Sequence, residues 1–450
     1  MKSICVWLWK DSGNGYAPRS VIRRAERFFN TYSDGEKEVY IMKVSKKILA
    51  LSLAACMTVP FFGACGSNSA SDSTDSTAAP EAEGDFTGTM VIGSIGPLTG
   101  GAAVYGNAVK NGIQLAVDEI NAAGGVNGIK LELNFQDDEH NEEKAVNAYN
   151  TLKDKDMKLL IGTVTSNPCI AVAAESAKDN IFQLTPSGSA VDCVANDNAF
   201  RICFNDPNQG TASAQYIAQN GLATKVAVIY DSSDVYSTGI YEKFAAEAAN
   251  QNLEVVAAEA FTADSKTDFS VQIQKVQESG AELLFLPIYY QEAALILQQA
   301  DKAGLNVKYF GCDGLDGLID QLGDDVAIAE GVMLLTPFAA DAADEKTVAF
   351  TTAYKNAYNG EVPIQFAADG YDAVYAVKAA MEKAGITDAS ISASDLCDAL
   401  KTAMTEITVD GVTGTITWTA DGEPSKDPKA MQIVITENED GTKTGSYAAL

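Results

Sequence analysis

The clearest pattern of apolar and polar positions lies in residues 90–128, MVIGSIGPLTGGAAVYGNAVKNGIQLAVDEINAAGGVNG. Its first three residues, 90–92, are apolar and predict a short strand, and a loop rich in glycine follows. From Asn107 the apolar residues recur three or four positions apart, which indicates a helix with one buried face. Gly124 and Gly125 end that helix. A loop between the carboxyl end of a strand and the amino end of a helix is where α/β proteins bind small ligands.

The same alternation of strands and helices continues along the chain, so we expect an α/β protein. A fresh series that begins at Lys225 indicates a second α/β lobe, and a β-rich part closes the chain. Further strands are expected at 130–135, 159–163, 181–184, 200–204, 225–230, 253–260, 283–287, 308–311, 332–336, 414–418 and 430–436. Further helices are expected at 145–152, 269–278, 291–303, 346–358 and 366–384, with two more beginning near Thr165 and Ser237.

Length and charge narrow the classes of partner. The 450 residues are enough for two or more domains with cores of their own. The whole chain carries 32 basic and 61 acidic residues. Residues 1–64 hold 10 basic and 5 acidic residues. This leaves 22 basic and 56 acidic residues in residues 65–450, a formal charge of −34 for that part of the chain. Nucleic acids and anionic membrane surfaces bind clusters of Lys and Arg, so we expect neither as a partner.

Histidine and cysteine usage bears on chemistry. His140 is the only histidine in the sequence, which argues against His-based catalysis and multi-histidine metal sites. The cysteines form no C-x-x-C motif, so neither a zinc site nor a redox motif is expected. Cys193 and Cys203 are close enough in the sequence for a disulfide, and buried free thiols are an equal alternative for all of them. The eight cysteines are Cys5, Cys56, Cys65, Cys169, Cys193, Cys203, Cys312 and Cys397.

Residues 1–41 differ from the remainder of the chain and contain WLWK and VIRRAERFFN without partner segments. We interpret them as a non-native leader and place the start of the protein at Met42. Lys37, Glu38 and Val39 can be encoded by a ribosome-binding sequence that would lie a few nucleotides before a start codon for Met42. A genuine leader is the alternative.

Residues 42–64 have the pattern of an export signal, with three lysines before an apolar run. That run is marginal in length for a permanent membrane span. Small residues precede Cys65, which resembles the lipobox where bacterial lipoproteins are acylated. Cys56 is the alternative, but cleavage there would leave an exposed apolar stub. The segment within 65–87 is rich in Ser, Asp and Ala, and we expect a flexible tether.

A run of acidic residues with a histidine occupies residues 137–143, DDEHNEE. Such a cluster is one candidate for a metal site, but it lacks the spacing of metal ligands. We favour a loop that ends in a helix cap at Asn141, followed by Glu142 and Glu143 in the first helical turn, where acidic side chains are favourable.

Two hydroxyl-rich loops, Thr165–Pro168 and Thr185–Ser189, follow predicted strands of the first series. Pro168 near a helix start leaves backbone amides free to bind a carboxylate. In the second series, Asp313 and several tyrosines follow the strands. A free amino acid needs such a set, because its carboxylate binds hydroxyls and amides and its ammonium needs an opposite charge. An aromatic wall suits an aliphatic side chain.

Many segments in a consistent order resemble the branched-chain amino-acid-binding (Leu/Ile/Val-binding) lipoproteins of ABC importers. They include IGPLTG at 95–100, LAVDEINAAGGVNG at 115–128, FRICFNDPNQG at 200–210 and TGTITWTADGEP at 413–424. The resemblance covers residues 89–435, nearly all of the mature chain, and it is specific because the segments match jointly.

The resemblance implies the type I periplasmic-binding-protein fold, in which two Rossmann-like lobes are joined by three crossovers. We expect the first lobe in residues 88–205 plus 337–416 and the second in residues 206–336 plus 417–446. Closure of the two lobes around a ligand is then a hinge motion.

The resemblance also implies a role for each residue of the ligand site. Ser166, Ser187, Gly188 and Ser189 belong to the two hydroxyl-rich loops, which hold the ligand carboxylate and contribute to binding of its ammonium. Asp313 supplies the opposite charge for the ammonium. The remaining residues shape the pocket and are Tyr105, Tyr236, Tyr290 and Phe366.

Three positions depart from the family pattern. Ser189 stands where well-known members have Thr, and Asp313 stands where some have Glu. Val235 looks like an extra residue before Tyr236. These departures make an amino-acid ligand a firmer expectation than a branched-chain one.

The implied protein is extracytoplasmic, monomeric and lipid-anchored through Cys65 to the outer face of the cytoplasmic membrane. It captures an aliphatic amino acid, with Leu, Ile or Val favoured, and delivers it to the permease subunits of an ABC transporter. We expect no catalysis, cofactor or metal. An amino-acid or amide sensor with the same fold is the alternative. A hydrolase that uses Ser166 or Ser189 would need a base such as His140, and no G-x-S-x-G elbow is present.

Overall fold

The computed structural model describes residues 86–426 and 428–450. The expected leader at 1–41, the signal at 42–64, Cys65 and all but the last two residues of the tether lie outside this range. None of the helices in the described part of the chain is long and apolar enough to cross a membrane.

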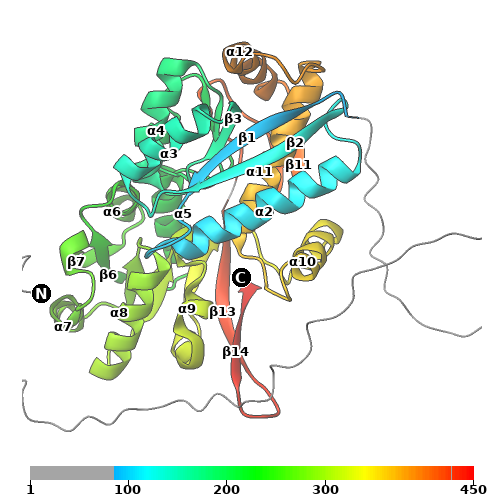
Figure 1. The fold of residues 1–450 in the computed structure, drawn as a ribbon. Helices are drawn as coiled ribbons and strands as arrows, with labels where there is room; N and C mark the ends of the chain where they lie inside the picture. Colours follow the sequence, from blue (N-terminus) through cyan, green and yellow to red (C-terminus); the bar gives the residue numbers. More distant parts are fainter. Residues whose placement is uncertain (1–85, 427) are drawn as a thin grey trace, which may run out of the picture. The chain divides into compact units, whose positions relative to one another are not determined.

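The first sheet is parallel, and its strands lie in the order β2-β1-β3-β4-β5. Figure 1 shows β1 between β2 and β3. The inner strands β1 and β3 are mostly buried because helices cover both faces of a parallel sheet, whereas the edge strand β2 begins with alternating buried and exposed residues. The strands are β1 (Gly88–Gly96), β2 (Ile129–Asp137), β3 (Met157–Gly162), β4 (Gln183–Thr185) and β5 (Ala199–Arg201). The helices between them are α2 (Ala103–Ala122), α3 (Glu142–Lys153) and α4 (Ser166–Asp179).

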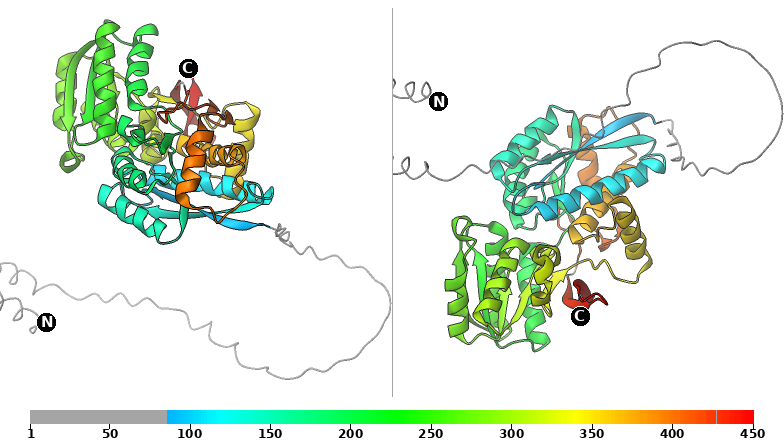
Figure 2. Two further views of the ribbon diagram at one scale, coloured as in Figure 1. Left: turned by 90° about the horizontal axis from the view of Figure 1, so that it is seen from above. Right: turned by 60° about the horizontal axis from the view of Figure 1, so that its bottom comes forward.

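Segments from far along the chain complete this first lobe. Figure 2 shows α11, drawn in orange, beside the cyan α2, and the two helices pack closely. A Cβ atom at Gly112 of α2 would lie 1.9 Å from the carbonyl oxygen of Ala367 in α11, so only glycine permits this approach. The late segments are α10 (Glu345–Ala357), α11 (Gln365–Lys383), α12 (Ala393–Met404) and the hairpin of β11 (Val409–Gly411) and β12 (Gly414–Ile416).

The second sheet has the order β14-β13-β10-β9-β8-β6-β7. Five of its strands are parallel, whereas β13 and β14 are antiparallel additions at one edge. The strands are β6 (Lys225–Asp231), β7 (Glu254–Phe261), β8 (Leu283–Leu286), β9 (Lys308–Gly311), β10 (Met333–Thr336), β13 (Lys429–Glu437) and β14 (Lys443–Ala449). The helices are α5 (Asp206–Gln219), α6 (Val235–Asn250), α7 (Ser270–Ser279), α8 (Tyr290–Ala303) and α9 (Leu318–Leu322).

The chain passes between the two lobes three times, after β5, after β10 and before β13. The predicted α/β fold of two Rossmann-like lobes with three crossovers is confirmed. Helix α5 was not among the helices expected from the sequence, where the strand at 200–204 was expected to end before Asn205. Asn205 is instead the helix cap, since its Oδ1 accepts a hydrogen bond from the Asn208 amide at 2.9 Å. The predicted strand at 200–204 ends early, at Arg201.

Five cysteines fall in the described range, and all are buried free thiols, including Cys193 and Cys203.

Helix α12 and strand β14 were not expected from the sequence. Strand β14 runs to Ala449 and therefore extends past residue 446, the expected end of the second lobe.

Candidate functional site

A small cavity lies among loops that follow strands of both sheets. Its volume is about 10 Å³, roughly the space for a single water molecule. The walls of the two lobes therefore have to separate before a larger ligand can enter. The residues that line it are Tyr105, Val164, Thr165, Ser166, Ser187, Ser189, Tyr236, Tyr289, Asp313, Gly314 and Phe366.

On the first-lobe side, the start of α4 faces the loop after β4. Thr165 occupies the N-cap position of α4 without a capping hydrogen bond from its side chain, and Ser166 is the first residue of the helix. The Ser166 hydroxyl accepts hydrogen bonds from the amides of Ser189, at 3.3 Å, and Ala190, at 3.2 Å. The Ser189 hydroxyl is buried and has no hydrogen-bond partner among the described residues. This wall therefore presents hydroxyl groups and helix-start amides, the groups that bind a carboxylate.

Arg201 supports the loop after β4 from behind. Its side chain is fully buried. The guanidinium donates hydrogen bonds to the carbonyl oxygens of Gly188 and Ala190, both at 3.0 Å, and lies 3.2 Å from a carboxylate oxygen of Glu423. Gly188 thus faces Arg201 through its carbonyl and does not line the cavity. Such charge-assisted bonds hold a loop in one conformation.

On the second-lobe side, Asp313 is the carboxylate of the cavity. It is 3% exposed, and this burial raises its pKa to about 7. The Tyr236 hydroxyl donates to Asp313 Oδ1 at 2.8 Å and accepts a bond from the Gly314 amide at 2.9 Å. Tyr236 therefore orients the carboxylate. Val235, the residue before Tyr236, is the first residue of α6 and is exposed.

Asp206 is a second buried carboxylate close to this site, and it was not expected there from the sequence. It is the first residue of α5, and its amide donates to the carbonyl oxygen of Ser189 at 3.0 Å. Neither of its carboxylate oxygens has a hydrogen-bond partner among the described residues. Burial, together with the charge of Asp313, raises the pKa of Asp206 well above its usual range. The raised pKa favours the neutral, protonated form of Asp206 beside Ser189.

Aromatic side chains form the rest of the wall. The ring of Tyr105 stacks on Phe366 with 4.2 Å between centroids, and Tyr236 stacks on Tyr289 at 4.9 Å. The Tyr105 hydroxyl crosses to the second lobe, where it donates to the carbonyl oxygen of Gly314 at 2.5 Å and accepts from the Tyr290 amide at 3.0 Å. These bonds join the lobes beside the cavity.

Seven of the nine ligand-binding residues expected from the sequence line the cavity, and two do not. Gly188 belongs to the loop after β4 but does not line the cavity. The ring of Tyr290 packs against the ring of Tyr105, with 5.0 Å between their centroids, and does not line the cavity either. The adjacent Tyr289, which precedes the first residue of α8, lines the cavity in its place. Thr165 and Tyr289 both directly precede a helix that follows a strand, and this position is the signal that could have identified them.

Among the described residues, His140 belongs to no group of potential metal ligands. No group of three or more potential metal ligands occurs in residues 86–426 and 428–450. Asn141 caps α3 by accepting a bond from the Lys144 amide at 3.0 Å, which confirms the predicted cap. His140 Nδ1 lies 2.8 Å from Thr165 Oγ1, and Nε2 lies 3.5 Å from an oxygen of Asp234.

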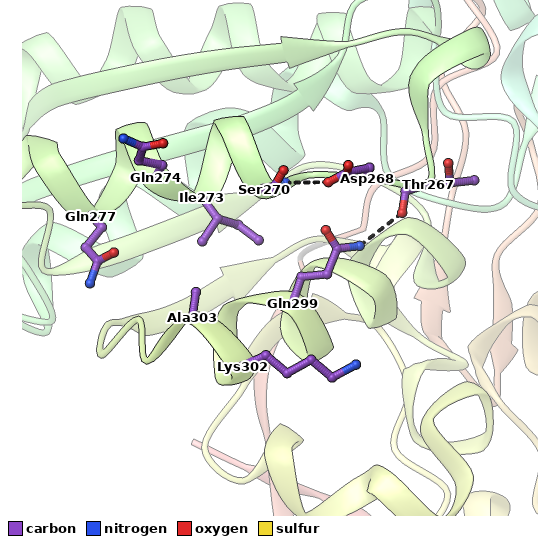
Figure 3. Close-up of a pocket in the computed structure, with 9 residues that line it drawn as sticks. All are labelled: Thr267, Asp268, Ser270, Ile273, Gln274, Gln277, Gln299, Lys302 and Ala303. Carbon is purple, nitrogen blue, oxygen red and sulfur yellow. Dashed lines mark hydrogen bonds between the residues drawn. The ribbon is translucent and has the colours of Figure 1, made fainter.

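Two larger grooves draw on one lobe each. One of about 500 Å³ lies between α7 and α8 (Figure 3). Two of its polar groups are already bonded locally, since Ser270 donates its amide to Asp268 and Gln299 donates to the Thr267 carbonyl. The other, of about 510 Å³, lies between α10, α11 and residues 408–412. Neither groove contains a residue expected in the ligand site, so the small cavity between the lobes is the candidate site.

Comparison with protein families and curated proteins gives consistent matches. A family model described as periplasmic binding protein matches residues 89–442. A Leu/Ile/Val-binding protein homolog from Brucella melitensis is 31% identical over 339 residues, which cover 75% of this chain and 89% of that protein. The Leu/Ile/Val-binding protein BraC3 from Rhizobium johnstonii is 33% identical over 349 residues, covering 75% and 91%.

Solved structures show the same fold with different ligands. The branched-chain amino acid transporter substrate-binding protein LivJ from Streptococcus pneumoniae, solved with isoleucine, has a TM-score of 0.69 at 28% identity, covering 80% of this chain and all of that chain. A solute-binding protein from R. palustris, solved with benzoate, has the same TM-score at 20% identity, covering 80% and 96%. The second likeness shows the fold alone. Benzoate lacks an ammonium group, so the fold by itself does not decide whether a ligand carries one.

Proposed function

The chain belongs to the periplasmic binding protein family, and from that membership we propose that it captures a free aliphatic amino acid between its lobes and delivers it to an ABC permease. Leu, Ile and Val are the favoured ligands. The protein binds its ligand without converting it and acts as a monomer. The Leu/Ile/Val-binding relatives and the LivJ structure support this class of ligand.

The strongest support for this proposal is the pairing of a carboxylate with hydroxyl and amide groups in one cavity. The buried Asp313 carboxylate lies in the same cavity as the hydroxyls of Ser166 and Ser189 and the amides at the start of α4. An α-amino acid has its ammonium and carboxylate on adjacent carbons, so it can satisfy both walls at once. A buried carboxylate without an opposite charge is unfavourable, and a ligand ammonium relieves that. Ser187 and Gly188 then support the ammonium end through their loop.

We place the ligand side chain against the aromatic wall formed by Tyr105, Tyr236, Tyr289 and Phe366. Stacked and edge-on rings offer a large apolar surface, which suits a branched aliphatic group. Tyr290 acts indirectly, because its amide bonds to the Tyr105 hydroxyl. The cavity has space for about one water molecule, so an amino acid enters when the lobes are apart, and the lobes that enclose it must lie farther apart than they do here.

The lobe boundaries and the anchor complete the proposal. We propose that the first lobe consists of residues 88–205 plus 337–416 and the second of residues 206–336 plus 417–446, with β14 extending the last segment to Ala449. Cys65 would carry the lipid that holds the protein at the outer face of the cytoplasmic membrane. Residues 1–41 remain a proposed non-native leader.

The proposal is tested with pairs of ligands that differ by one group. Thermal stabilisation is measured with all free amino acids and with 4-methylpentanoate, which is leucine without its ammonium. We expect stabilisation by Leu, Ile or Val and none by 4-methylpentanoate at the same concentration. A panel in which no amino acid stabilises the protein would overturn the ligand class, and stabilisation by the acid alone would indicate a carboxylate binder.

Amino-acid binding should weaken in acid because of Asp313. In the free protein its pKa is raised to about 7, so the carboxyl is neutral below that pH. A bound ammonium favours the carboxylate, and ligand binding must then displace a proton. We expect affinity for L-leucine to fall about tenfold per pH unit as the pH drops below 7. Titration calorimetry from pH 5 to pH 8 measures this decrease in affinity. An affinity that does not change with pH over this range would contradict the proposed role of Asp313.

Membrane attachment should depend on one thiol. We expect Cys65→Ser to move the protein from the membrane fraction to the soluble fraction of fractionated cells, because acylation requires the thiol. Cys56→Ser is the matched control and should leave the protein in the membrane fraction. The reverse result would place the anchor at Cys56.

A further inference from the structure

His140 joins the two lobes at the edge of the ligand cavity. It belongs to the loop between β2 and α3 in the first lobe, and Asp234 caps α6 in the second. We propose that His140 is a positioning residue that ties the cavity residue Thr165 to Asp234 and, when protonated, holds the lobes together on a bound ligand. This inference rests on the proposed function and adds a control by pH to it.

The imidazole contacts a hydroxyl on one side and a carboxylate on the other. His140 Nδ1 lies 2.8 Å from Thr165 Oγ1, and Nε2 lies 3.5 Å from Asp234 Oδ2. The Thr165 hydroxyl can donate to Nδ1 of a neutral ring or accept from a charged one, so this contact forms in either state; only the charged ring adds an attraction between opposite charges to the contact of Nε2 with Asp234. The ring also meets Tyr289 edge-on, with 5.5 Å between centroids. His140 therefore contacts two residues that line the cavity, one from each lobe.

A second contact between the lobes lies beside this one. The side-chain oxygen of Asn167 in α4 accepts a hydrogen bond from the Val235 amide at 3.2 Å. The amino ends of α4 and α6 thus meet at the same edge of the cavity that His140 spans. Opening the lobes would break both contacts, so any change in the His140–Asp234 interaction changes the balance between open and closed forms.

Other ionisable groups around His140 set the direction of the effect. Burial alone lowers the pKa of His140, but its interactions with Asp234 and Asp138 outweigh burial and the nearby charge of Lys266, so its pKa lies above the usual value. Asp138 is buried, and its pKa is raised to about 6. Asp137, which also faces Asp138, has a lowered pKa because hydrogen bonds from Thr99 and neighbouring amides outweigh burial. Burial raises the pKa of the Tyr289 phenol well above its usual range.

His140 and Asp313 respond to pH in opposite directions. A raised His140 pKa in the closed form means that protonation favours closure, and this contribution is lost as the pH rises through that pKa. Asp313 acts in the opposite sense, because its protonation weakens binding below about pH 7. A plot of the affinity for L-leucine against pH should therefore fall at low pH because of Asp313, which is its acid limb. It should also fall at high pH because of His140, which is its alkaline limb.

Two substitutions isolate the contact with little change elsewhere. His140 has a φ of +56°, a conformation that Asn tolerates well, so His140→Asn should fold. Its side chain can still reach Thr165 but not Asp234. Asp234→Asn removes the charge and keeps a helix cap, since Asp234 Oδ1 accepts from the Tyr236 amide and Asn caps as well as Asp.

The test uses full-length protein without a histidine tag. Because the sequence has a single histidine, ¹³C-labelled histidine gives one resonance, whose titration reports the pKa of His140 without any ligand. We expect this pKa to fall in Asp234→Asn. We also expect wild-type affinity for L-leucine to drop about two- to fivefold more than that of His140→Asn between pH 6.5 and pH 8.5. The acid limb should be the same in both proteins.

Each outcome decides the inference. An unchanged His140 pKa in Asp234→Asn, or equal alkaline limbs in wild type and His140→Asn, would overturn it while leaving amino-acid binding intact. If L-leucine binds neither protein at any pH, the proposed ligand is wrong, and the titration of His140 then decides by itself whether the contact between lobes exists.

Discussion

Asp313→Asn should lose most of its affinity for an amino-acid ligand. The substitution keeps the shape of the side chain, and the Tyr236 hydroxyl can still donate to the remaining oxygen, as it does to Asp313 Oδ1 at 2.8 Å. The ligand ammonium, however, would enter a buried wall without this charge. Removing one partner of a buried, hydrogen-bonded charge pair costs about 2–5 kcal/mol, or roughly 30- to several-thousand-fold in affinity. Calorimetry with L-leucine at pH 8 measures the loss.

Loss of binding through misfolding is separated by a second measurement. Burial raises the pKa of Asp313, so the carboxylate form destabilises the folded protein above about pH 7. Without ligand at pH 8, Asp313→Asn should therefore unfold at the same temperature as wild type or a higher one. Asp320→Asn makes the same chemical change at an exposed position of α9 and should leave affinity within threefold, roughly the limit for an exposed charge. Unchanged L-leucine affinity in Asp313→Asn would remove Asp313 from the site.

Lys426→Met should be the most destabilising of the substitutions considered. Lys426 and Asp369 are 3% and 1% exposed, and their charged atoms lie 3.1 Å apart. The ammonium also donates to the carbonyl oxygen of Ile202 at 3.1 Å, so it connects α11 with the crossover after β5 and the one before β13. Methionine would leave the carboxylate of Asp369 buried without its partner. The expected loss in free energy of unfolding is about 3–5 kcal/mol, measured by urea denaturation.

A double substitution tests this explanation. In Lys426→Met with Asp369→Leu, both charges are gone and apolar groups of similar volume meet, so most of the lost stability should return. Lys378→Met provides the matched surface control. Lys378 and Glu382 are partly exposed on α11, at 29% and 43%, and removing that pair should cost about 0.3–0.5 kcal/mol. A double variant as unstable as Lys426→Met alone would show that packing, and not the unpaired charge, causes the loss.

Local patterns in the sequence were sufficient for most of the fold. Periodicity placed the strands and helices because a buried face repeats every two residues in a strand and every three to four in a helix. The restart at Lys225 separated the two lobes. Helix α5 was missed because Asn205-Asp206-Pro207 can end a strand or begin a helix, and only the hydrogen bond from the Asn208 amide to Asn205 decides between them.

The sequence also located the hydroxyl and charged groups of the candidate site, for a topological reason. Parallel strands end at the same edge of a sheet, so residues that directly follow them must lie close together. Ser166, Ser189 and Asp313 satisfy this condition and line one cavity. Their proposed roles come from the resemblance to a family and from the chemistry of an amino acid.

Other features depend on tertiary structure. Which of two adjacent tyrosines faces the cavity depends on where α8 begins, and this selects Tyr289 instead of Tyr290. The pKa of Asp313 is raised because its side chain is buried between the two lobes, and the amino-acid composition does not reveal such burial. The contacts of His140 with Asp234 and of Lys426 with Asp369 join residues 94 and 57 positions apart. Sequence patterns report the neighbours of a residue along the chain, whereas a partner across a hinge is decided only when the two lobes meet.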